Sequence, residues 1–493
     1  MVGCILVYRF PFALSVKRLA NAANTSTSSA STSRISLSHA PSSGTLAEFL
    51  STSKQGYLQS LREGKGSDWI VVMGNEAGDL DTLVSSIAYA YFSGNNTVAL
   101  QQTPRADLRL RPENMYALER SSLGTGDSLL CIDDLPADIP YPPPGSKFAL
   151  VDHNSLNARF NVTPPATPVQ VVGIIDHHDD DHAYMDAPLR DIQVPTGSCA
   201  SLVANHFRSA SQTSPSTSQL PPELASLLLS AILIDTDGLK EGGKAEPADH
   251  EAAAYLLPLA TAKQEPAQLA SDVAVLELTR VLNEKKFAVE SLGARDLLRR
   301  DYKEYTIARG SQQVKVGLAT VPLSLQRIFE LSSERGVTGN EQPAEFWSGL
   351  DGWLEERSLD AVLVLCSFHA PKKSKEGKGK GADTHKATKT GKPAGKHNRQ
   401  ILVVVRGGES LKEVADDLFA GLETATELEN EEVNVAELLA SKKKKGKGKQ
   451  FGEIRPNGSR VRAYNQKNAD PSRKVIAPLI KSIISGPNAA TST

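Results

Sequence analysis

Short apolar runs alternate with segments of helical periodicity from about residue 66 onward. The runs cover residues 69–74, 97–102, 128–133, 148–153 and 171–176. Apolar residues at helical spacing fill the stretches between several of them, such as 81–92 and 113–120. Continuous apolar strands that alternate with helices are typical of a parallel sheet covered on both faces. The pattern therefore predicts an α/β fold with an N-terminal parallel sheet.

The remainder of the chain predicts a second, smaller domain. Helical patterns at 199–207 and 224–239 follow the sheet, and charged helical sequence runs from about 246 to 300. Strand-like runs return at 315–321, 360–368 and 401–407. We therefore expect a first domain at 66–280 and a C-terminal α/β or α+β domain at 281–490.

The composition fits a soluble protein of two domains with tails. At 493 residues and 40% hydrophobic content the chain can bury two cores, and 5% aromatic residues are too few for a nucleic-acid stacking platform. Four scattered cysteines without a CxxC pair suit a reducing compartment. No run reaches the roughly 18–20 apolar residues of a membrane span. We expect a cytoplasmic protein without nucleic-acid or membrane partners.

Two tracts rich in lysine and glycine interrupt the C-terminal half. Residues 371–397 hold nine lysines and two acids, and residues 441–449 hold six more lysines. Together they carry a net charge of +13, so the rest of the chain is near −15 although the total is −2. Such tracts cannot form a packed core, and we expect disordered inserts. They are either solvated and dispensable or attract a polyanion.

Residues 1–65 precede the first predicted strand. Their first part is rich in serine and threonine, is basic, and has no acidic residue before Glu48. This composition resembles a mitochondrial presequence, and a plain disordered tail explains it equally well. We expect this segment to be disordered or to act in targeting, which would add a mitochondrial pool to the cytoplasmic one.

Acidic side chains and histidines gather where predicted strands end. They are Asp79 and Asp81 after 69–74, Asp152 and His153 after 148–151, and Asp176, His177 and His178 after 171–175. Asp235 and Asp237 lie in the apolar helix 224–239. In an open parallel sheet, ligands bind outside the carboxyl ends of the strands. We therefore expect distant segments to converge on one crevice.

Such a concentration of carboxylates requires positive charge. Carboxylates held close together repel one another and raise one another's pKa values. Bound cations resolve this conflict, and carboxylates with one or two imidazoles suit Mg²⁺ or Mn²⁺ better than structural Zn²⁺. The pattern therefore predicts one wall of a two-metal site.

The ordered motifs GNEAGDLDT, VDHN, IIDHH and SAILIDTD resemble those of the DHH phosphoesterase superfamily. The branch with family II inorganic pyrophosphatases, eukaryotic exopolyphosphatases and prune-like proteins is most similar. The stretches 103–120, 197–203, 295–305 and 470–480 look specifically like exopolyphosphatases. The resemblance covers about residues 66–482 without the lysine tracts. It implies a DHH domain, a C-terminal substrate-binding domain and an active site in the cleft between them.

The resemblance also implies roles for individual residues. It implies two divalent cations, Mg or Mn, bound by Asp79, Asp81, Asp152, His177 and Asp235. The groups assigned to catalysis and phosphate binding are His178, Arg473 and Lys474. An earlier phosphate-binding lysine would be Lys286 or Lys285. Asp176 would orient His177 from behind.

Several further residues have two interpretations. His153 either contacts substrate or fills the crevice wall. Ser198, after Gly197 and near a helix start, either presents its hydroxyl to phosphate or caps the helix. Arg105 and Arg111 either line a polyanion channel or pair with acids on a surface.

Asn75 departs from the pyrophosphatase pattern. Those enzymes begin the first motif with histidine, whereas the resemblance implies asparagine in exopolyphosphatases. An amide oxygen is a harder and weaker ligand than imidazole, so one metal site would favour Mg²⁺.

The sequence thus predicts an exopolyphosphatase that releases orthophosphate from the ends of inorganic polyphosphate, as a monomer. The alternatives are a pyrophosphatase or a prune-like enzyme acting on short polyphosphates or nucleotides, a nucleic-acid exonuclease, and a non-catalytic polyanion-binding protein.

Overall fold

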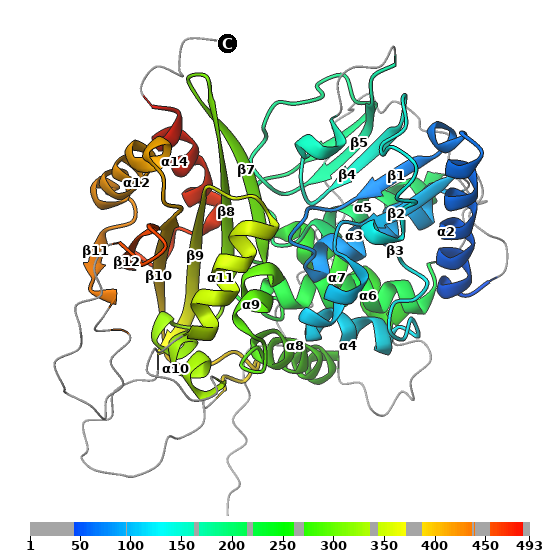
Figure 1. The fold of residues 1–493 in the computed structure, drawn as a ribbon. Helices are drawn as coiled ribbons and strands as arrows, with labels where there is room; N and C mark the ends of the chain where they lie inside the picture. Colours follow the sequence, from blue (N-terminus) through cyan, green and yellow to red (C-terminus); the bar gives the residue numbers. More distant parts are fainter. Residues whose placement is uncertain are drawn as a thin grey trace, which may run out of the picture. The chain divides into compact units, whose positions relative to one another are not determined.

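The computed structural model describes residues 44–94, 96–161, 167–213, 220–260, 271–335, 344–370, 387–435, 438 and 454–486. Two α/β domains make up this part of the chain (Figure 1). No helix within these ranges is long and apolar enough to cross a bilayer.

The N-terminal domain is built on a six-stranded sheet. Its strands are β1 (Ile70–Met73), β2 (Thr97–Gln101), β3 (Leu130–Cys131), β4 (Lys147–Val151), β5 (Gln170–Asp176) and β6 (Leu189–Ile192). The strand order is β3-β2-β1-β4-β5-β6, and every pair is parallel. The order reverses between β1 and β4. In doubly wound sheets such a switch point is where ligands bind.

Side chains from the two faces of this sheet enter two cores. Val72, Ala149 and Ile175 pack with the helices on one face, and Val71 and Phe148 point to the other. The helices are α2 (Leu46–Arg62), α3 (Leu80–Ser93), α4 (Pro112–Arg120), α5 (Cys199–Thr213), α6 (Pro222–Thr236), α7 (Pro247–Ala260) and α8 (Ser271–Phe287). The prediction of a parallel sheet covered on both faces is confirmed.

Helix α2 corrects one expectation. It lies inside the segment 1–65 that the sequence analysis assigned to disorder or targeting. Thr45 and Glu48 form a capping box at its start, with Thr45 Oγ1 accepting from the Glu48 N–H at 3.2 Å. The buried Leu50 and Tyr57 attach α2 to the two cores of the sheet. Residues 44–65 therefore belong to the folded domain.

The C-terminal domain contains a mixed sheet. Its strands are β7 (Tyr302–Arg309), β8 (Gln312–Val321), β9 (Ala361–Ala370), β10 (Lys396–Val405), β11 (Asn430–Val433) and β12 (Arg460–Gln466). The order is β11-β12-β10-β9-β8-β7, with β8 and β9 parallel and the other pairs antiparallel. Along β9, Val362 and Val364 enter one core while Leu363 and Leu365 enter the other.

Helices cover both faces of the mixed sheet (Figure 1). On one side are α9 (Ala294–Arg300), α10 (Leu325–Arg335) and α11 (Ala344–Glu356), and on the other α12 (Lys412–Thr424) and α14 (Arg473–Ser485). Helix α8 runs through the domain boundary predicted at 280/281 and packs on α4 and α6 of the N-terminal domain. The boundary at 280/281 therefore falls inside a helix.

Part of the first lysine tract lies within the described residues. Residues 371–386 and 441–449 lie outside the described residues. Residues 387–397, the end of the first predicted insert, are ordered: Ala387 pairs with Pro393, and β10 begins at Lys396. Lys392 lies 3.3 Å from Asp237. The expectation of a disordered insert is therefore wrong for these residues.

A buried ion cluster joins the two domains. At the end of α9, Arg300 donates to Glu113 Oε1 of α4 at 2.7 Å and to the Leu110 carbonyl at 2.9 Å. Arg111 Nη1 lies 3.3 Å from the same Glu113 oxygen. Arg111, Glu113 and Arg300 are 5%, 0% and 6% exposed. Burial opposes ionisation of Glu113, but the two guanidiniums keep its pKa below the usual value.

Candidate metal centre

The centre is at the switch point between β1 and β4. Asp152 follows the end of β4 and has a φ of 60°, the left-handed conformation that aspartate tolerates better than most residues. On the β1 side, α3 begins beside the strand because Gly74 is small. A Cβ at Gly74 would lie 2.8 Å from the Thr82 carbonyl oxygen. This close packing brings the first turn of α3 to Asp152.

The first turn of α3 contributes two predicted ligands. Asp79 is the N-cap of the helix, and its Oδ1 accepts from the Thr82 N–H at 3.1 Å. Asp81 lies within the first turn and is 3% exposed. The Thr82 hydroxyl donates to Asp152 Oδ2 at 2.5 Å. Helix α3 thus both supplies carboxylates and fixes the carboxylate of β4.

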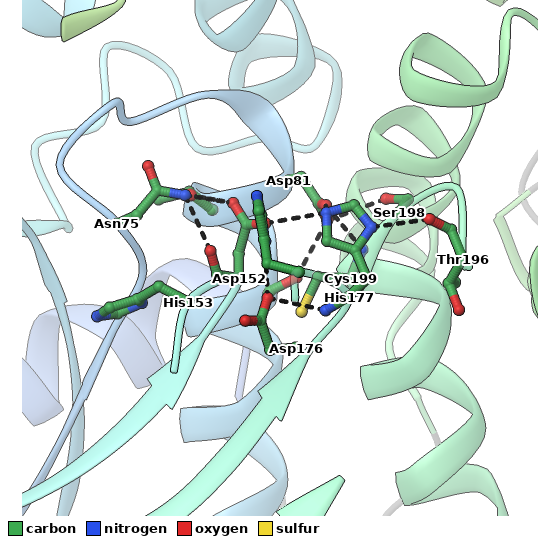
Figure 2. A network of polar contacts seen from close by, with 12 residues as sticks. Asn75, Asp81, Asp152, His153, Asp176, His177, Thr196, Ser198 and Cys199 are labelled. Atoms are coloured by element: carbon green, nitrogen blue, oxygen red, sulfur yellow. Dashed lines mark hydrogen bonds and ion pairs between the residues drawn. The ribbon is translucent and has the colours of Figure 1, made fainter. Parts of the chain in front are cut away.

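Asp152 faces His177 (Figure 2), and it also lies close to His178, the second histidine after β5. Its Oδ1 lies 3.2 Å from His177 Nε2 and 3.6 Å from His178 Nδ1. Donor atoms of these three residues lie within 4.8 Å of one another, as those of a metal-binding group do. Asp81 Oδ2 is 3.8 Å from His177 Nε2. The ligands predicted after β1, β4 and β5 therefore meet at one point.

The two histidine rings are oriented by different partners. His177 Nδ1 contacts the Thr196 carbonyl at 3.0 Å, which turns Nε2 toward Asp152. Asp176 Oδ1 contacts His178 Nδ1 at 2.8 Å and only the backbone N–H of His177, also at 2.8 Å. The expectation that Asp176 orients the His177 ring is therefore wrong. The chain turns after β5, so the carboxylate reaches the ring two residues ahead.

Ser198 supports Asp81 instead of facing solvent. The serine is 0% exposed, and its hydroxyl donates to Asp81 Oδ1 at 2.9 Å. At the start of α5, the N–H groups of Cys199 and Ala200 donate to the same carboxylate, each at 2.7 Å. The helix N-terminus thus stabilises the buried charge. The expectation that Ser198 presents its hydroxyl to phosphate is corrected, because no surface remains for a ligand.

Asp249 holds this turn in place. Its carboxylate is fully buried and accepts from the N–H groups of Gly197 at 2.8 Å, Ser198 at 3.2 Å and Glu246 at 2.8 Å. The Ser201 hydroxyl donates to it at 2.6 Å. Asp249 was not predictable from the sequence, because an acid in the first turn of a helix is common and carries no local signal of a distant role.

Asn75 also acts on Asp152. Its amide nitrogen donates to Asp152 Oδ2 at 2.7 Å and to the Asp152 carbonyl at 3.0 Å. Its amide oxygen accepts from the Ala77 N–H at 2.9 Å. The amide oxygen, expected as a metal ligand, is therefore engaged by the backbone, and Asn75 positions Asp152.

Electrostatic interactions link the two remaining predicted ligands, Asp79 and Asp235, to Asp81, Asp152 and His177. Burial, followed by the charges of Asp152 and Asp235, raises the pKa of Asp81 well above its usual value. Burial and the charges of Asp79 and Asp152 raise the pKa of Asp235 to about 6, although Lys286 and His177 oppose them. The charges of Asp79 and Asp235 thus act on the same group as Asp81, Asp152 and His177.

This donor set fits divalent cations. Burial lowers the pKa of His177, but the contact with Asp152 outweighs it and raises that pKa to about 9. Protons therefore balance part of the negative charge. Asp235 lies near the C-terminus of α6, where the helix dipole also disfavours a carboxylate. Divalent cations would supply positive charge to the same group of oxygen and nitrogen donors and would release these protons.

Cationic side chains of the C-terminal domain approach the centre. Arg473, the first residue of α14, donates to Asp301 Oδ1 at 2.8 Å. The positive charge of Lys474 partly opposes the rise in the pKa of His177. The charge of Asp79 acts in turn on Arg473, so both predicted phosphate-binding residues interact electrostatically with the metal centre.

The two candidate lysines, Lys286 and Lys285, have different surroundings. Lys286 acts on the pKa of Asp235, whereas the Lys285 ammonium lies 5.1 Å from the centre of the Tyr116 ring. Lys286 is therefore the lysine beside the centre.

Two further lysines near the centre were missed by the sequence analysis. Burial and the charge of Arg473 lower the pKa of Lys303, while Asp152 is among the acids that oppose this. Burial and neighbouring lysines lower the pKa of Lys244, and the charge of Asp235 opposes this decrease. Lys303 lies in β7, and Lys244 lies in the glycine-rich link between α6 and α7. The "DYKEY" stretch around Lys303 had been noted only for its resemblance.

The remaining candidates lie outside the ligand group. His153 Nδ1 contacts the Val151 carbonyl at 2.9 Å, and its ring points away from His177 (Figure 2). Asp237 pairs with Lys392. Arg105 pairs with Asp134 at 2.5 Å, so its surface interpretation holds.

Two family models match the chain. The model of the DHH family, N-terminal domain, matches residues 69–232, and that of the DHHA2 domain matches residues 280–483. These ranges contain the parallel sheet and the mixed sheet respectively. The chain therefore belongs to the DHH/DHHA2 proteins and is related to exopolyphosphatases and family II pyrophosphatases.

Similar proteins carry two kinds of name. A Schizosaccharomyces pombe protein named "Putative exopolyphosphatase" is 36% identical over 48% of this chain and 59% of its own length. "Exopolyphosphatase PRUNE1" of Rattus norvegicus is 26% identical over 64% of this chain and 63% of its own. A "Probable manganese-dependent inorganic pyrophosphatase" of Archaeoglobus fulgidus is 27% identical over 55% of this chain and 80% of its own length. The chain spans about three fifths of the length of the first two relatives.

Proposed function

We propose that this protein is a metal-dependent exopolyphosphatase that releases orthophosphate from the ends of inorganic polyphosphate. The observation that carries the proposal is the convergence of Asp81, Asp152 and His177 at the switch point, with cationic side chains of the second domain beside them. Phosphoryl transfer requires positioning and charge neutralisation more than covalent chemistry, and this arrangement suits both.

The ligands would be the predicted set. Two divalent cations, Mg²⁺ or Mn²⁺, held by Asp79, Asp81, Asp152, His177 and Asp235, would supply positive charge and lower the pKa of a bound water toward about 7. Ser198 and the start of α5 hold Asp81 in one orientation. Thr82 and Asn75 do the same for Asp152.

Other residues of the chain would handle phosphate and protons. Arg473, Lys474 and Lys303 would bind phosphoryl oxygens and neutralise the leaving phosphate. His178 Nδ1 lies 2.8 Å from the Asp176 carboxylate, so Nε2 would be the ring atom left to face the substrate.

A family II pyrophosphatase or a prune-like enzyme for short polyphosphates or nucleotides is the second candidate. Relatives of both kinds are similar to this chain, and the metal ligands alone do not separate them. The engagement of Asn75 with Asp152 favours the exopolyphosphatase, because the pyrophosphatase pattern requires histidine at that position.

The test is phosphate release with Mg²⁺ or Mn²⁺ from long-chain polyphosphate and from pyrophosphate. We expect release mainly from the long chain, and a loss of more than about 100-fold in Asp152→Asn, since even residues behind a ligand cost 10–100-fold. Asp186→Asn, at an exposed position, is the matched control. Thermal unfolding and Mn²⁺ titration would separate loss of metal from loss of fold.

Three results would change the proposal. Faster release from pyrophosphate would assign the protein to the second candidate. Turnover of Asp152→Asn equal to that of the control would refute the metal centre. Absence of release from either substrate with both metals would refute polyphosphate hydrolysis altogether.

A further inference from the structure

A cavity of about 220 Å³ lies between the two domains, apart from the predicted metal ligands. Its wall contains five arginines, contributed by both domains: Arg111, Arg159, Arg299, Arg300 and Arg357. The other lining residues include three acids, Glu76, Asp107 and Glu356. The ionisable side chains that line the cavity thus carry a net positive charge.

Two sequence stretches without a predicted metal ligand form much of this wall. Residues 103–120 contribute Thr103, Leu110 and Asn114 besides Arg111. Residues 295–305 contribute Arg299, Arg300 and Tyr302. Both stretches were noted above for their resemblance to exopolyphosphatases, and neither contains a metal ligand. Their convergence on one cavity gives them a shared role.

Most of the arginines already have carboxylate partners. Arg299 pairs with Asp107, and Arg357 donates to Glu304 at 2.8 Å. Arg111 and Arg300 share Glu113. These four guanidiniums are fixed in the wall, and their charges are largely compensated.

Arg159 differs from the other four. It is exposed, and no carboxylate of the described residues lies within ion-pair distance of it. Its Nη2 donates to the Gln102 amide oxygen at 2.5 Å, and its guanidinium lies 4.6 Å from the centre of the Phe160 ring. Gln102 and Phe160 thus hold at the cavity a cation that has no ion-pair partner among the described residues. A guanidinium in this state suits an anion with several acceptor oxygens.

Glu76 acts on Arg159 through its charge but makes its hydrogen bonds to other residues. Glu76 lines the cavity, but its Oε1 accepts from the Glu304 N–H at 2.7 Å and its Oε2 accepts from Asn157 at 3.1 Å. Both carboxylate oxygens therefore have donors of their own. An anion entering the cavity would meet Arg159 before a free carboxylate.

The cavity adjoins the metal centre along two segments. Glu76, Ala77 and Gly78 line it, and they directly connect Asn75 with Asp79. Tyr302 lines it from the other domain and precedes Lys303, whose pKa is influenced by Asp152. A chain of phosphates with one end at the metal centre would therefore have the cavity beside it.

The volume limits the ligand. Sites for drug-sized ligands usually enclose about 300–1,000 Å³, and a water molecule occupies about 30 Å³. A cavity of about 220 Å³ is large enough for a phosphoryl group with water.

We propose that this cavity is a second phosphoryl-binding subsite, in which Arg159 binds a phosphoryl group of the polyphosphate chain away from the hydrolysed end. The inference rests on the proposed function and extends it to substrate length. Pyrophosphate, with two phosphoryl groups, would leave the subsite empty. Longer chains would fill it, so Arg159 contributes to the preference for them.

The first test measures binding without turnover. Tripolyphosphate is titrated calorimetrically into wild type, Arg159→Met, Arg159→Lys and the control Arg109→Met, all in EDTA. Arg109 is an exposed arginine of the same region that does not line the cavity. We expect about tenfold weaker binding in Arg159→Met, equivalent to about 1.4 kcal/mol, partial recovery with lysine, and no change in the control.

The second test measures turnover with Mg²⁺. In Arg159→Met we expect KM for long-chain polyphosphate to rise about tenfold while the kinetics with pyrophosphate stay as in wild type. Equal tripolyphosphate binding by wild type and Arg159→Met, or no binding by wild type, would overturn the subsite. Loss of binding in Arg159→Met without turnover in any variant would refute the hydrolase and leave an anion site. The two failures are therefore distinguishable.

Discussion

Replacing Asp249 tests whether the metal centre depends on a residue that touches none of the metal ligands. Asp249 accepts four hydrogen bonds in a fully buried position and fixes the turn before α5. That turn places the Ser198 hydroxyl and two backbone N–H groups on Asp81. We expect substitution of Asp249 to lower both stability and metal affinity.

The magnitude follows from the donors that lose an acceptor. In Asp249→Asn the new NH₂ group is best placed at the Oδ1 position. There the Ser201 hydroxyl, which donates to Asp249 in the wild type, can instead accept a hydrogen bond from the NH₂ group. Only the Ser198 N–H, at 3.2 Å, then lacks a partner. One unsatisfied buried donor costs about 1–3 kcal/mol. Asp249→Ala leaves three backbone N–H groups without acceptors, so we expect a loss of about 3 kcal/mol or more.

Urea unfolding and Mn²⁺ titration of Asp249→Asn, Asp249→Ala and the exposed control Asp186→Asn provide the assay. We expect the control to lose the least stability, Asp249→Asn to lose more and Asp249→Ala to lose the most. The metal affinity should fall about 10–100-fold in Asp249→Ala. Equal stability of the two Asp249 variants would refute the hydrogen-bond argument. Unchanged Mn²⁺ affinity in both would refute the coupling to Asp81.

Two further substitutions are predicted to act through single contacts. Ser198→Ala removes one donor from Asp81 and should weaken Mn²⁺ binding at least several-fold without abolishing the fold; unchanged affinity would contradict this role. Burial opposes ionisation of Asp301, but the charges of Arg473 and Arg111 keep its pKa at about 2. The substitution Asp301→Asn should therefore lower the free energy of unfolding by about 2 kcal/mol at pH 7. The pKa of Asp301 is lower in the folded protein than the value near 4 in the unfolded chain. The difference in stability between wild type and Asp301→Asn should therefore vanish as the pH falls from about 4 to about 2. A difference in urea unfolding that does not depend on pH would refute the assignment.

Most of the strands that sequence reasoning found lie inside their sheets and are buried on both faces. Residues 148–151 and 361–366 are continuously apolar because the corresponding strands, β4 and β9, are central strands. The strands it missed include β6, β7 and β11, which are edge strands in the order of each sheet. An edge strand is partly solvated, so polar residues interrupt its apolar pattern, as in "YKEYTIAR" of β7.

The candidate site divides in a similar way. Asp81, Asp152 and His177 were predictable because each follows or adjoins a strand end that the topology brings to one edge. The residues that support them were not. Thr82 and Asp249 look like ordinary helix-start residues, and only the packing of α3 and α5 against the sheet shows which carboxylate or turn each one holds.

The ion cluster of Arg111, Glu113 and Arg300 restricts how the two domains can move. Separating a buried pair leaves an unpaired charge and costs about 3–5 kcal/mol. Any opening of the molecule that keeps this cluster intact must therefore be a rotation about it. Displacements would be smallest at Glu113 and would grow with distance from that pivot. Substrate would then enter from the side farthest from α4, while the arginines beside the pivot keep their positions throughout.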